Sequence, residues 1–228
     1  MKLHGWGRYP VVDSTVFSPA TAAAVVEVIQ QEGQGEMIPR GLGRSYGDSS
    51  LASNVLQTTQ MDHFLSFDDA SGELCCSAGL SLAEILDSFV PRGWFLPVTP
   101  GTRFVTIGGA IASDVHGKNH HRDGSFSEHI STMKVATVSD GLVACSRQQF
   151  PELFHATCGG MGLTGVILEA TLNLKPIRSS TIQETTIKAA NLEEAVALLD
   201  DNHSAQYSVA WIDCLSTCLL YTSDAADD

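Results

Sequence analysis

Three glycine-bearing segments constrain what this chain can fold into more than any other feature of its sequence. They occupy residues 40–48 (RGLGRSYGD), 100–110 (PGTRFVTIGGA) and 159–167 (GGMGLTGVI). The first segment is not a dinucleotide-binding fingerprint, because its third glycine comes one residue late and a predicted strand, not a helix, follows it. A Rossmann fold is therefore not predicted.

The first segment allows two interpretations. Its glycines leave the backbone N–H groups unobstructed, and such a loop can form a concave site for an anion such as a pyrophosphate. The same glycines also suit a plain turn that needs positive φ angles. The second segment places Gly108 and Gly109 at the start of a predicted short helix, where the backbone can approach a ligand closely. Three such loops in one domain favour a large ligand with several polar groups.

The pattern of apolar residues predicts a mixture of helices and strands. Helices are predicted over 20–32, with Ser18 as cap and Pro19 in the first turn, over 81–90 behind a capping box of Ser81 and Glu84, and over 151–157. Strands are predicted over 36–40, 54–59, 73–78, 94–98, 129–138, 142–146 and 164–174. Because strands and helices do not alternate strictly, we expect the α+β class rather than a doubly wound sheet.

A change of composition at residues 178–180 (RSS) indicates a linker between two domains. Residues 1–178 then form the first domain. A strand over 181–188, a helix over 192–200 capped by Asn191 and a strand over 207–213 begin a second domain over 179–217.

The last eleven residues differ in kind from the rest. Residues 218–227 (CLLYTSDAAD) match the translation of a string that resembles a transposon adapter used in preparing sequencing libraries. We therefore expect residues 218–228 to be adapter read-through rather than native protein. The natural chain would then be cut near Thr217, and the strands predicted at 181–188 and 207–213 would lack sheet partners.

Charge and hydropathy narrow the functional classes. Lys and Arg number 13 against 26 Asp and Glu, a net charge of −13, so nucleic-acid binding is not predicted. The sequence shows neither an apolar run long enough to span a membrane nor an apolar leader, so we expect a cytoplasmic or peripheral membrane location. The six cysteines lack zinc-site spacing and are predicted to be free thiols, with Cys75 and Cys76 on opposite faces of a strand.

Residues 40–48, 97–125 (PVTPGTRFVTIGGAIASDVHGKNHHRDGS) and 153–167 (LFHATCGGMGLTGVI) together resemble the vanillyl-alcohol-oxidase type of flavoprotein. Within that family they are similar to the decaprenylphosphoryl-β-D-ribose oxidases of arabinan-precursor synthesis. The motifs are specific as a set, and the resemblance covers about residues 3–216. It implies a two-lobed PCMH-type FAD-binding domain followed by an incomplete substrate (cap) domain.

The resemblance also implies which residues hold FAD. The first loop would wrap the pyrophosphate, and the GGAIA segment would run beside the flavin. The residues expected to contact FAD are Arg40, Gly41, Leu42, Gly43, Arg44, Ser45, Tyr46, Gly47, Asp48, Ser49, Gly101, Thr102, Thr106, Ile107, Gly108, Gly109, Ser113, Asp114, Val115, His116 and Ile167. Relatives that attach FAD covalently often use a His in the first loop. Because Arg44 stands at that position, the expected FAD is non-covalent.

Residues 116–121 (HGKNHH) leave three interpretations open: a metal site, a plain exposed loop and a flavin-facing segment. A carboxylate pair to complete a ligand set is missing, so no metal is predicted. In the resembled subfamily the residue matching His116 lies at the flavin and substrate, and the one matching Lys118 faces a sugar phosphate. Tyr46 matches a tyrosine near the flavin, with a buried core aromatic as the alternative. His116, Lys118 and Tyr46 are thus the predicted catalytic residues.

The implied reaction is oxidation of a sugar hydroxyl, with the 2′-hydroxyl of a prenylphosphoryl-β-D-ribose becoming a 2′-keto group. A separate short-chain reductase would complete the epimerisation, and a lipid-linked substrate would bring the enzyme to a membrane surface. The alternatives are an FAD-dependent alditol or sugar-lactone oxidase and, from another class, a non-catalytic FAD- or metal-binding module. The chain as given is expected to be inactive, because most of the cap domain would be missing.

Overall fold

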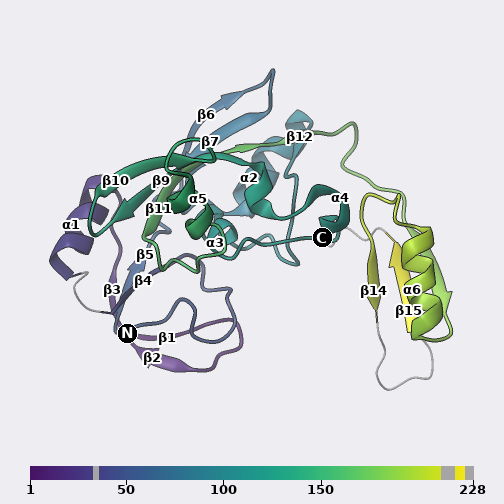
Figure 1. The fold of residues 1–228 in the computed structure, drawn as a ribbon, viewed down its shortest axis with the longest axis horizontal. Coiled ribbons are helices and arrows are strands. Elements are labelled where there is room, and N and C mark those ends of the chain that lie inside the picture. Colours follow the sequence, from purple (N-terminus) through teal and green to yellow (C-terminus); the bar gives the residue numbers. More distant parts are fainter. Residues whose placement is uncertain (33–35, 212–218, 224–228) are drawn as a thin grey trace.

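The computed structural model describes residues 1–32, 36–211 and 219–223 and shows a large body joined to a smaller unit (Figure 1). The large body begins with β1 (Lys2–His4) and β2 (Val11–Asp13), which pair antiparallel. A parallel sheet in the order β3-β5-β4 follows. Its strands are β3 (Thr15–Phe17), β4 (Met37–Arg40) and β5 (Asn54–Gln57).

An antiparallel sheet in the order β10-β9-β11-β7-β6 forms the centre of the large body. Its strands are β6 (Phe64–Asp68), β7 (Glu73–Ser77), β9 (Ile130–Thr137), β10 (Gly141–Ser146) and β11 (Val166–Asn173). The hairpin between β9 and β10 turns at the predicted Asp-Gly pair, where Gly141 has a φ of 66°. The sequence did not predict β6. The bounds predicted for the other four strands agree with the structure to within two residues.

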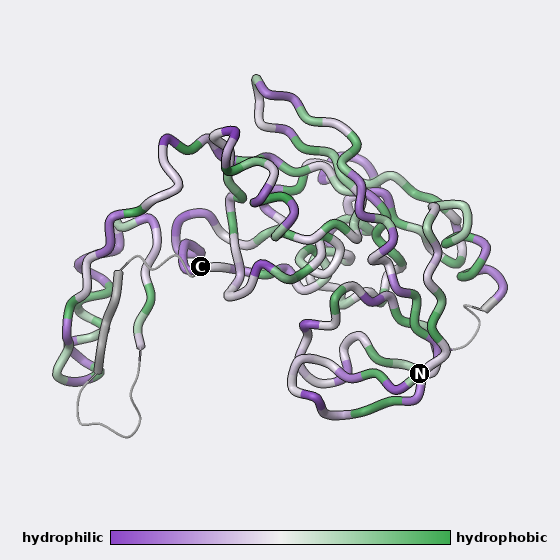
Figure 2. Tube along the Cα trace, turned by 180° about the vertical axis from the view of Figure 1, so that it is seen from behind, coloured by the Kyte–Doolittle hydropathy of each residue, from purple (hydrophilic) through white to green (hydrophobic). Residues whose placement is uncertain are grey.

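Short helices lie around the central sheet. They are α2 (Leu82–Phe89), η1 (Val90–Arg92), α3 (Ile107–Ala112), α4 (His120–Asp123), η2 (Phe126–His129) and α5 (Pro151–Thr157). β8 (Trp94–Phe95) pairs with β12 (Lys175–Pro176) at one side. Figure 2 shows hydrophobic residues along the strands inside this body and hydrophilic residues in its loops. Leu74, Ile85, Phe126 and Phe154 are fully buried there, and each contributes about 1.5–3 kcal/mol to folding.

α1 (Ala22–Glu32) joins the two sheets, because Val25 and Ile29 pack in one cluster with Leu56 of β5 and Ala136 of β9. The predicted start of this helix is wrong. It begins at Ala22, and the hydroxyl of Thr21 accepts a hydrogen bond from the Ala24 N–H at 3.2 Å. The chain thus passes Ser18 and Pro19 before the helix starts.

The capping box predicted for α2 is confirmed. The Ser81 hydroxyl accepts from the Glu84 N–H at 3.2 Å, and the Glu84 carboxylate accepts from the Ser81 N–H at 2.8 Å. These bonds satisfy two backbone N–H groups that the helix itself cannot pair.

The smaller unit, residues 185–223, contains β13 (Thr185–Ala189), α6 (Leu192–Asp201), β14 (Val209–Trp211) and β15 (Leu219–Ser223). Asn191 caps α6 as predicted, accepting from the Glu194 N–H at 2.9 Å. The strand order is β13-β15-β14. The expectation that β13 and β14 lack partners is therefore wrong, because β15, which falls in the segment read as adapter, pairs antiparallel with both. The origin of that segment and the domain boundary at 178 stay predictions. The predicted strand residues 212 and 213 lie outside the described range.

The cysteines that the structure describes are free thiols. Cys75 is half-buried and Cys76 fully buried, as expected for opposite faces of β7. Burial raises the pKa of the Cys76 thiol to about 12, and the pKa values of Cys145 and Cys158 to about 11. These three thiols are therefore held in the protonated, unreactive form at neutral pH.

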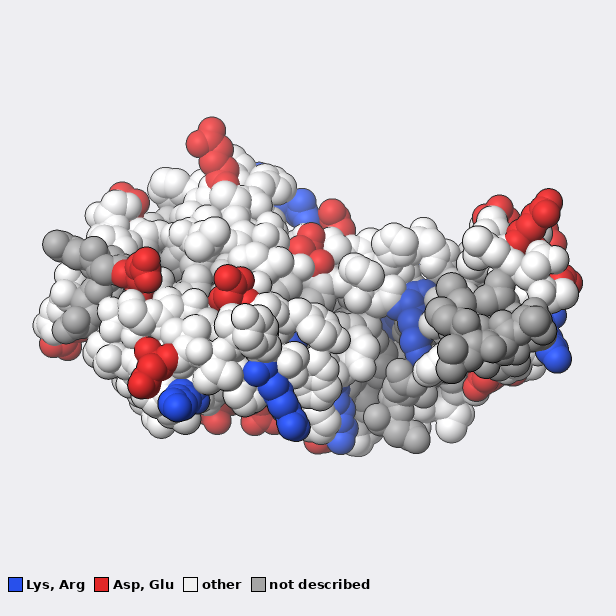
Figure 3. Space-filling model, turned by 90° about the horizontal axis from the view of Figure 1, so that it is seen from below, with Lys and Arg blue, Asp and Glu red and all other residues white. Residues whose placement is uncertain are grey.

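Charged side chains are scattered over the face seen in Figure 3 rather than gathered in a continuous basic surface. Within the described part of the chain, helices are too short or too polar to cross a membrane.

Candidate functional site

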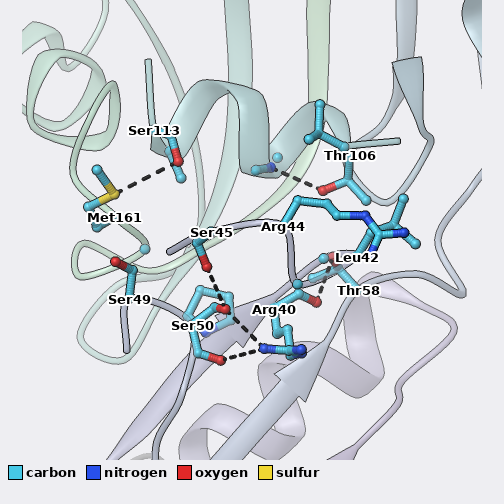
Figure 4. A pocket seen from close by; sticks show the side chains of 18 of the residues that line it. Arg40, Leu42, Arg44, Ser45, Ser49, Ser50, Thr58, Thr106, Ser113 and Met161 are labelled. Carbon is cyan, nitrogen blue, oxygen red and sulfur yellow. Dashed lines mark hydrogen bonds between the residues drawn. The ribbon is translucent and has the colours of Figure 1, made fainter. Parts of the chain in front are cut away.

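A pocket of about 480 Å³ lies where the three glycine-bearing loops converge (Figure 4). One wall is the loop after β4, the opposite wall is the segment that leads into α3, and the loop before β11 closes one side. Of the predicted cofactor residues, those lining it are Arg40, Gly41, Leu42, Gly43, Arg44, Ser45, Tyr46, Ser49, Thr102, Thr106, Gly108, Gly109, Ser113, Val115 and Ile167. The structure thus brings together residues separated by more than a hundred positions in the sequence.

The first loop is held from below by the guanidinium of Arg40 (Figure 4). Its Nη2 donates to the His4 carbonyl at 2.8 Å, and its Nη1 donates to the carbonyl and the hydroxyl of Ser50 at 3.2 and 3.1 Å. The Trp6 N–H donates to the Ser45 carbonyl at 2.8 Å. Burial lowers the pKa of the Arg40 guanidinium, which stays charged because its ordinary value is so high. The β1–β2 hairpin is thus fastened to the loop that forms the pocket wall.

The upper side of this loop has the chemistry of an anion site. Among the described residues, the N–H groups of Leu42, Gly43, Arg44 and Ser45 donate no hydrogen bond to the protein, so these donors are available to a ligand or to water. The charged side chains that line the pocket are both arginines, Arg40 and Arg44. The Arg44 guanidinium lies 5.3 Å from the centre of the Trp6 ring, which holds it at the rim. Successive N–H groups and a cation suit a phosphate group.

The second loop contributes a wall rather than hydrogen-bond donors. The N–H groups of Ile107 and Gly108 donate to the carbonyls of Leu80 and Ala78, both at 2.8 Å, and the Gly109 N–H donates to the Thr106 hydroxyl at 3.1 Å. These three N–H groups are therefore paired within the protein, and the loop offers a ligand a close backbone surface. A Cβ at Gly108 would lie 3.2 Å from Ala78, so this glycine lets α3 pack closely on the end of β7.

The third loop supplies pocket residues that sequence reasoning missed. Met161 lines the pocket with its sulfur 3.8 Å from the Ser113 hydroxyl, and Gly162 packs against Pro39 of β4. The glycines of this loop are the sequence feature from which these pocket residues could have been predicted. The other lining residues missed are Pro39, Ser50, Thr58, Pro100, Val105, Ala112 and Gly165.

Several predicted residues lie outside the pocket lining, namely Gly47, Asp48, Gly101, Ile107, Asp114, His116 and Lys118. Ile107 is fully buried in the core. The Asp114 carboxylate accepts from the Ser125 hydroxyl and the Ser127 N–H, both at 2.9 Å, and so fixes the following loop. Tyr46 lines the pocket with 74% of its surface exposed, which rules out the core-aromatic alternative.

Two of the three predicted catalytic residues, His116 and Lys118, lie on the segment that leaves α3. His116 is exposed and pairs by a backbone bridge with Ser125, and its ring lies 5.6 Å from that of His120. Lys118 is half-buried. Asn119, the residue after Lys118, is fully buried and anchors the segment by donating to the Pro97 carbonyl at 2.7 Å and the Asp123 carboxylate at 2.6 Å. A set of three His, Cys, Asp or Glu side chains placed to hold a metal ion is not found among the described residues.

Comparison with known proteins agrees with this geometry. Residues 14–146 match the family model described as FAD binding domain. The decaprenylphosphoryl-β-D-ribose oxidase of Mycolicibacterium smegmatis is 37% identical over 224 residues, which cover 94% of this chain and 48% of that protein.

More distant relatives include two named for sugar lactones. The mitochondrial L-galactono-1,4-lactone dehydrogenase of Arabidopsis thaliana is 28% identical over 83% of this chain and 31% of its own length. The L-gulonolactone oxidase of Bos taurus is 25% identical over 89% of this chain and 46% of its own length. The chain thus spans about half the length of these relatives or less. With the family match and the 37% relative together, it belongs to the FAD-dependent oxidoreductases that share a PCMH-type FAD-binding domain.

Proposed function

We propose that this chain is the cofactor-binding part of an oxidoreductase that holds FAD without a covalent bond and oxidises a sugar hydroxyl. The observation that carries the proposal is the pocket itself, where a glycine loop with available N–H groups and an arginine faces a wall of small residues. The preferred substrate is the 2′-hydroxyl of a prenylphosphoryl-β-D-ribose, oxidised to the 2′-keto sugar of an arabinan precursor. The 37% identity with a decaprenylphosphoryl-β-D-ribose oxidase supports this choice.

The residues present fit FAD. A Cβ at Gly41 or Gly43 would collide with the Thr106 side chain or the Arg40 guanidinium, so the loop lies as close to its supports as glycine allows. The N–H groups of residues 42–45 and Arg44 would hold the pyrophosphate, and Tyr46 and Met161 would contact the rest of the cofactor. When bound, FAD supplies a two-electron acceptor for the hydride of a sugar C–H bond.

His116 and Lys118 are proposed to act on the substrate. An exposed imidazole can act as a general base and take up the hydroxyl proton. A lysine ammonium can hold a sugar phosphate as a point charge. Both side chains belong to the segment directly after α3, which forms a wall of the pocket, so substrate at this segment would lie beside the cofactor.

FAD loaded onto the chain is expected to be released by acid, because Arg44 stands where covalent relatives use a histidine. The chain would be saturated with FAD, precipitated with trichloroacetic acid and washed. The yellow colour should appear in the supernatant, with a protein mass unchanged by mass spectrometry. Colour that stays with the washed pellet would contradict the non-covalent proposal.

His116→Ala and Lys118→Ala are expected to lower turnover by at least about a hundredfold, the usual scale for an acid–base or phosphate-binding group, while FAD affinity changes little. Turnover is measured on the FAD-loaded protein with a prenylphosphoryl-β-D-ribose as substrate. His63→Ala is the control, since it removes an exposed imidazole that pairs with Asp62 and does not line the pocket. Bound zinc, iron or copper that is lost in these variants would favour the metal-site alternative.

A sugar-lactone or alditol oxidase is the second candidate, supported by the two relatives named for lactone substrates. Anaerobic mixing with each sugar separates the two, because only a true substrate bleaches the flavin absorbance. A non-catalytic FAD module would be bleached by none of them. A short-chain reductase partner and contact with a membrane surface remain parts of the preferred proposal, and both follow from a lipid-linked 2′-keto product.

A further inference from the structure

The loop between α6 and β14, residues 204–208, docks onto the segment of the large body that carries His116 and Lys118. α4, which ends this segment, lies on the side of the large body that faces the smaller unit (Figure 1). Residues 177–184, which join the two bodies along the chain, form neither helix nor strand. The position of the smaller unit therefore depends on contacts between the two surfaces as well as on the covalent connection.

Three hydrogen bonds join the 204–208 loop to α4 and the residues before it. The Arg122 guanidinium donates to the Ser204 carbonyl at 2.6 Å, and the His121 imidazole Nε2 lies 3.0 Å from the Ala205 carbonyl. In the other direction, the Ser208 N–H donates to the Lys118 carbonyl at 2.9 Å.

A second set of contacts holds the same loop to β12. The Lys175 ammonium donates to the Tyr207 hydroxyl at 2.6 Å and lies 4.9 Å from the centre of the Tyr207 ring. The same ammonium lies 5.7 Å from the Phe95 ring of β8. Figure 3 shows basic side chains at the narrowing between the two bodies. The 204–208 loop is thus fixed at two points of the large body that are far apart in the sequence.

We propose that the 204–208 loop positions the 116–122 segment, with Arg122 and Tyr207 as positioning residues for the substrate site. This inference depends on the proposed function in one respect, since it takes His116 and Lys118 as the residues that contact substrate. Asn119 fastens the inner side of the segment through Pro97 and Asp123. The 204–208 loop fastens its outer side at Lys118, His121 and Arg122. The smaller unit then sets the geometry of residues that belong to the large body.

The test is amide hydrogen exchange of the FAD-loaded chain, followed by mass spectrometry. The backbone N–H groups of Arg122, Asp123 and Gly124 are hydrogen-bonded within the segment and report its opening. Arg122→Ala should speed their exchange by about tenfold, the scale of one lost hydrogen bond to a charged donor, with FAD affinity unchanged. Arg122→Lys, which keeps a donor, should restore part of the protection. Arg92→Ala is the control, since Arg92 pairs with Asp69 at 3.5 Å and not with the loop.

Tyr207→Phe provides a second, milder variant, since it removes the hydroxyl bound by Lys175 and keeps the ring. It should speed the same amides less than Arg122→Ala does. Exchange in the 116–124 region that is unaltered in both variants would overturn the proposal, as would an equal rise in the β9 amides, which would indicate general loss of stability. If no sugar proves to be a substrate, the exchange result still stands, so failure of the proposed function is separable from failure of this inference. If turnover is measurable, both variants should lower kcat more than they raise KM.

Discussion

Gly41→Ala is expected to weaken FAD binding by about 10- to 100-fold, the cost of forcing one carbon into a packed site. The new Cβ would lie 3.0 Å from Thr106 Cγ2 and nearer still to its hydroxyl. Thr106 cannot move aside freely, because it is 1% exposed and its hydroxyl caps α3 through the Gly109 N–H. The first loop and α3 must therefore separate, which changes both walls of the pocket. A fluorescence titration of the apoprotein with FAD measures the effect.

Gly101→Ala is the matched control for this experiment. Unlike Gly41, Gly101 lies outside the pocket lining, and nothing lies within 4 Å of a Cβ placed on it. FAD affinity should therefore stay within about twofold of the parent chain. Equal losses in the two variants would show that the close contact of Gly41 with Thr106 is not what shapes the site.

Gly162→Ala is expected to lower the free energy of unfolding by about 2–4 kcal/mol, because backbone strain and steric overlap add at this position. Its φ of +81° is costly for any residue with a side chain. The added Cβ would also lie 2.7 Å from Cγ and 3.1 Å from Cδ of Pro39, a rigid ring on β4. The third loop must then move away from β4, which opens the pocket. Urea unfolding followed by circular dichroism gives the loss of stability.

Gly159→Ala separates the effect of backbone strain from the effect of steric overlap. Its φ of +72° is nearly the same, but its Cβ would meet only Asp114 Cβ at an ordinary 3.5 Å. In this variant, backbone strain alone should lower the free energy of unfolding, by about 1 kcal/mol. If it proves as unstable as Gly162→Ala, packing against Pro39 contributes nothing measurable.

The sequence predicted the elements whose signals are local. The capping box of α2, the Asn191 cap of α6 and the Asp-Gly hairpin between β9 and β10 depend on residues a few positions apart, and the structure has each of them. β6 was missed because four of its five residues are exposed, so it lacks the alternation of apolar and polar residues that marks a half-buried strand. The partner of β13 was missed because β15 lies within residues 218–228, which were interpreted as adapter read-through and excluded from the strand prediction.

The candidate site could also be predicted only in part. The glycine loops were recognisable, and they converge on one pocket. Which backbone groups remain available could not be predicted, because the N–H groups of Ile107 and Gly108 are used by carbonyls of a distant segment, residues 78–80. Asp114 matched a cofactor motif, and in the structure its carboxylate accepts hydrogen bonds from Ser125 and Ser127. Motif matching places a residue near a site, and only the fold decides whether it faces the ligand or the supporting loops.

The hydrogen bonds from Arg40 to His4 and from Trp6 to Ser45 couple the stability of the β1–β2 hairpin to the binding of FAD. Coupling free energies are reciprocal, so if the β1–β2 hairpin shapes the loop for FAD, bound FAD stabilises the hairpin by the same amount. Under flavin shortage, the β1–β2 hairpin would separate from this loop more often, and the apoprotein would be cleaved by proteases faster than the holoprotein. Cofactor supply would thereby set the abundance of the protein, with apoprotein removed first and holoprotein spared.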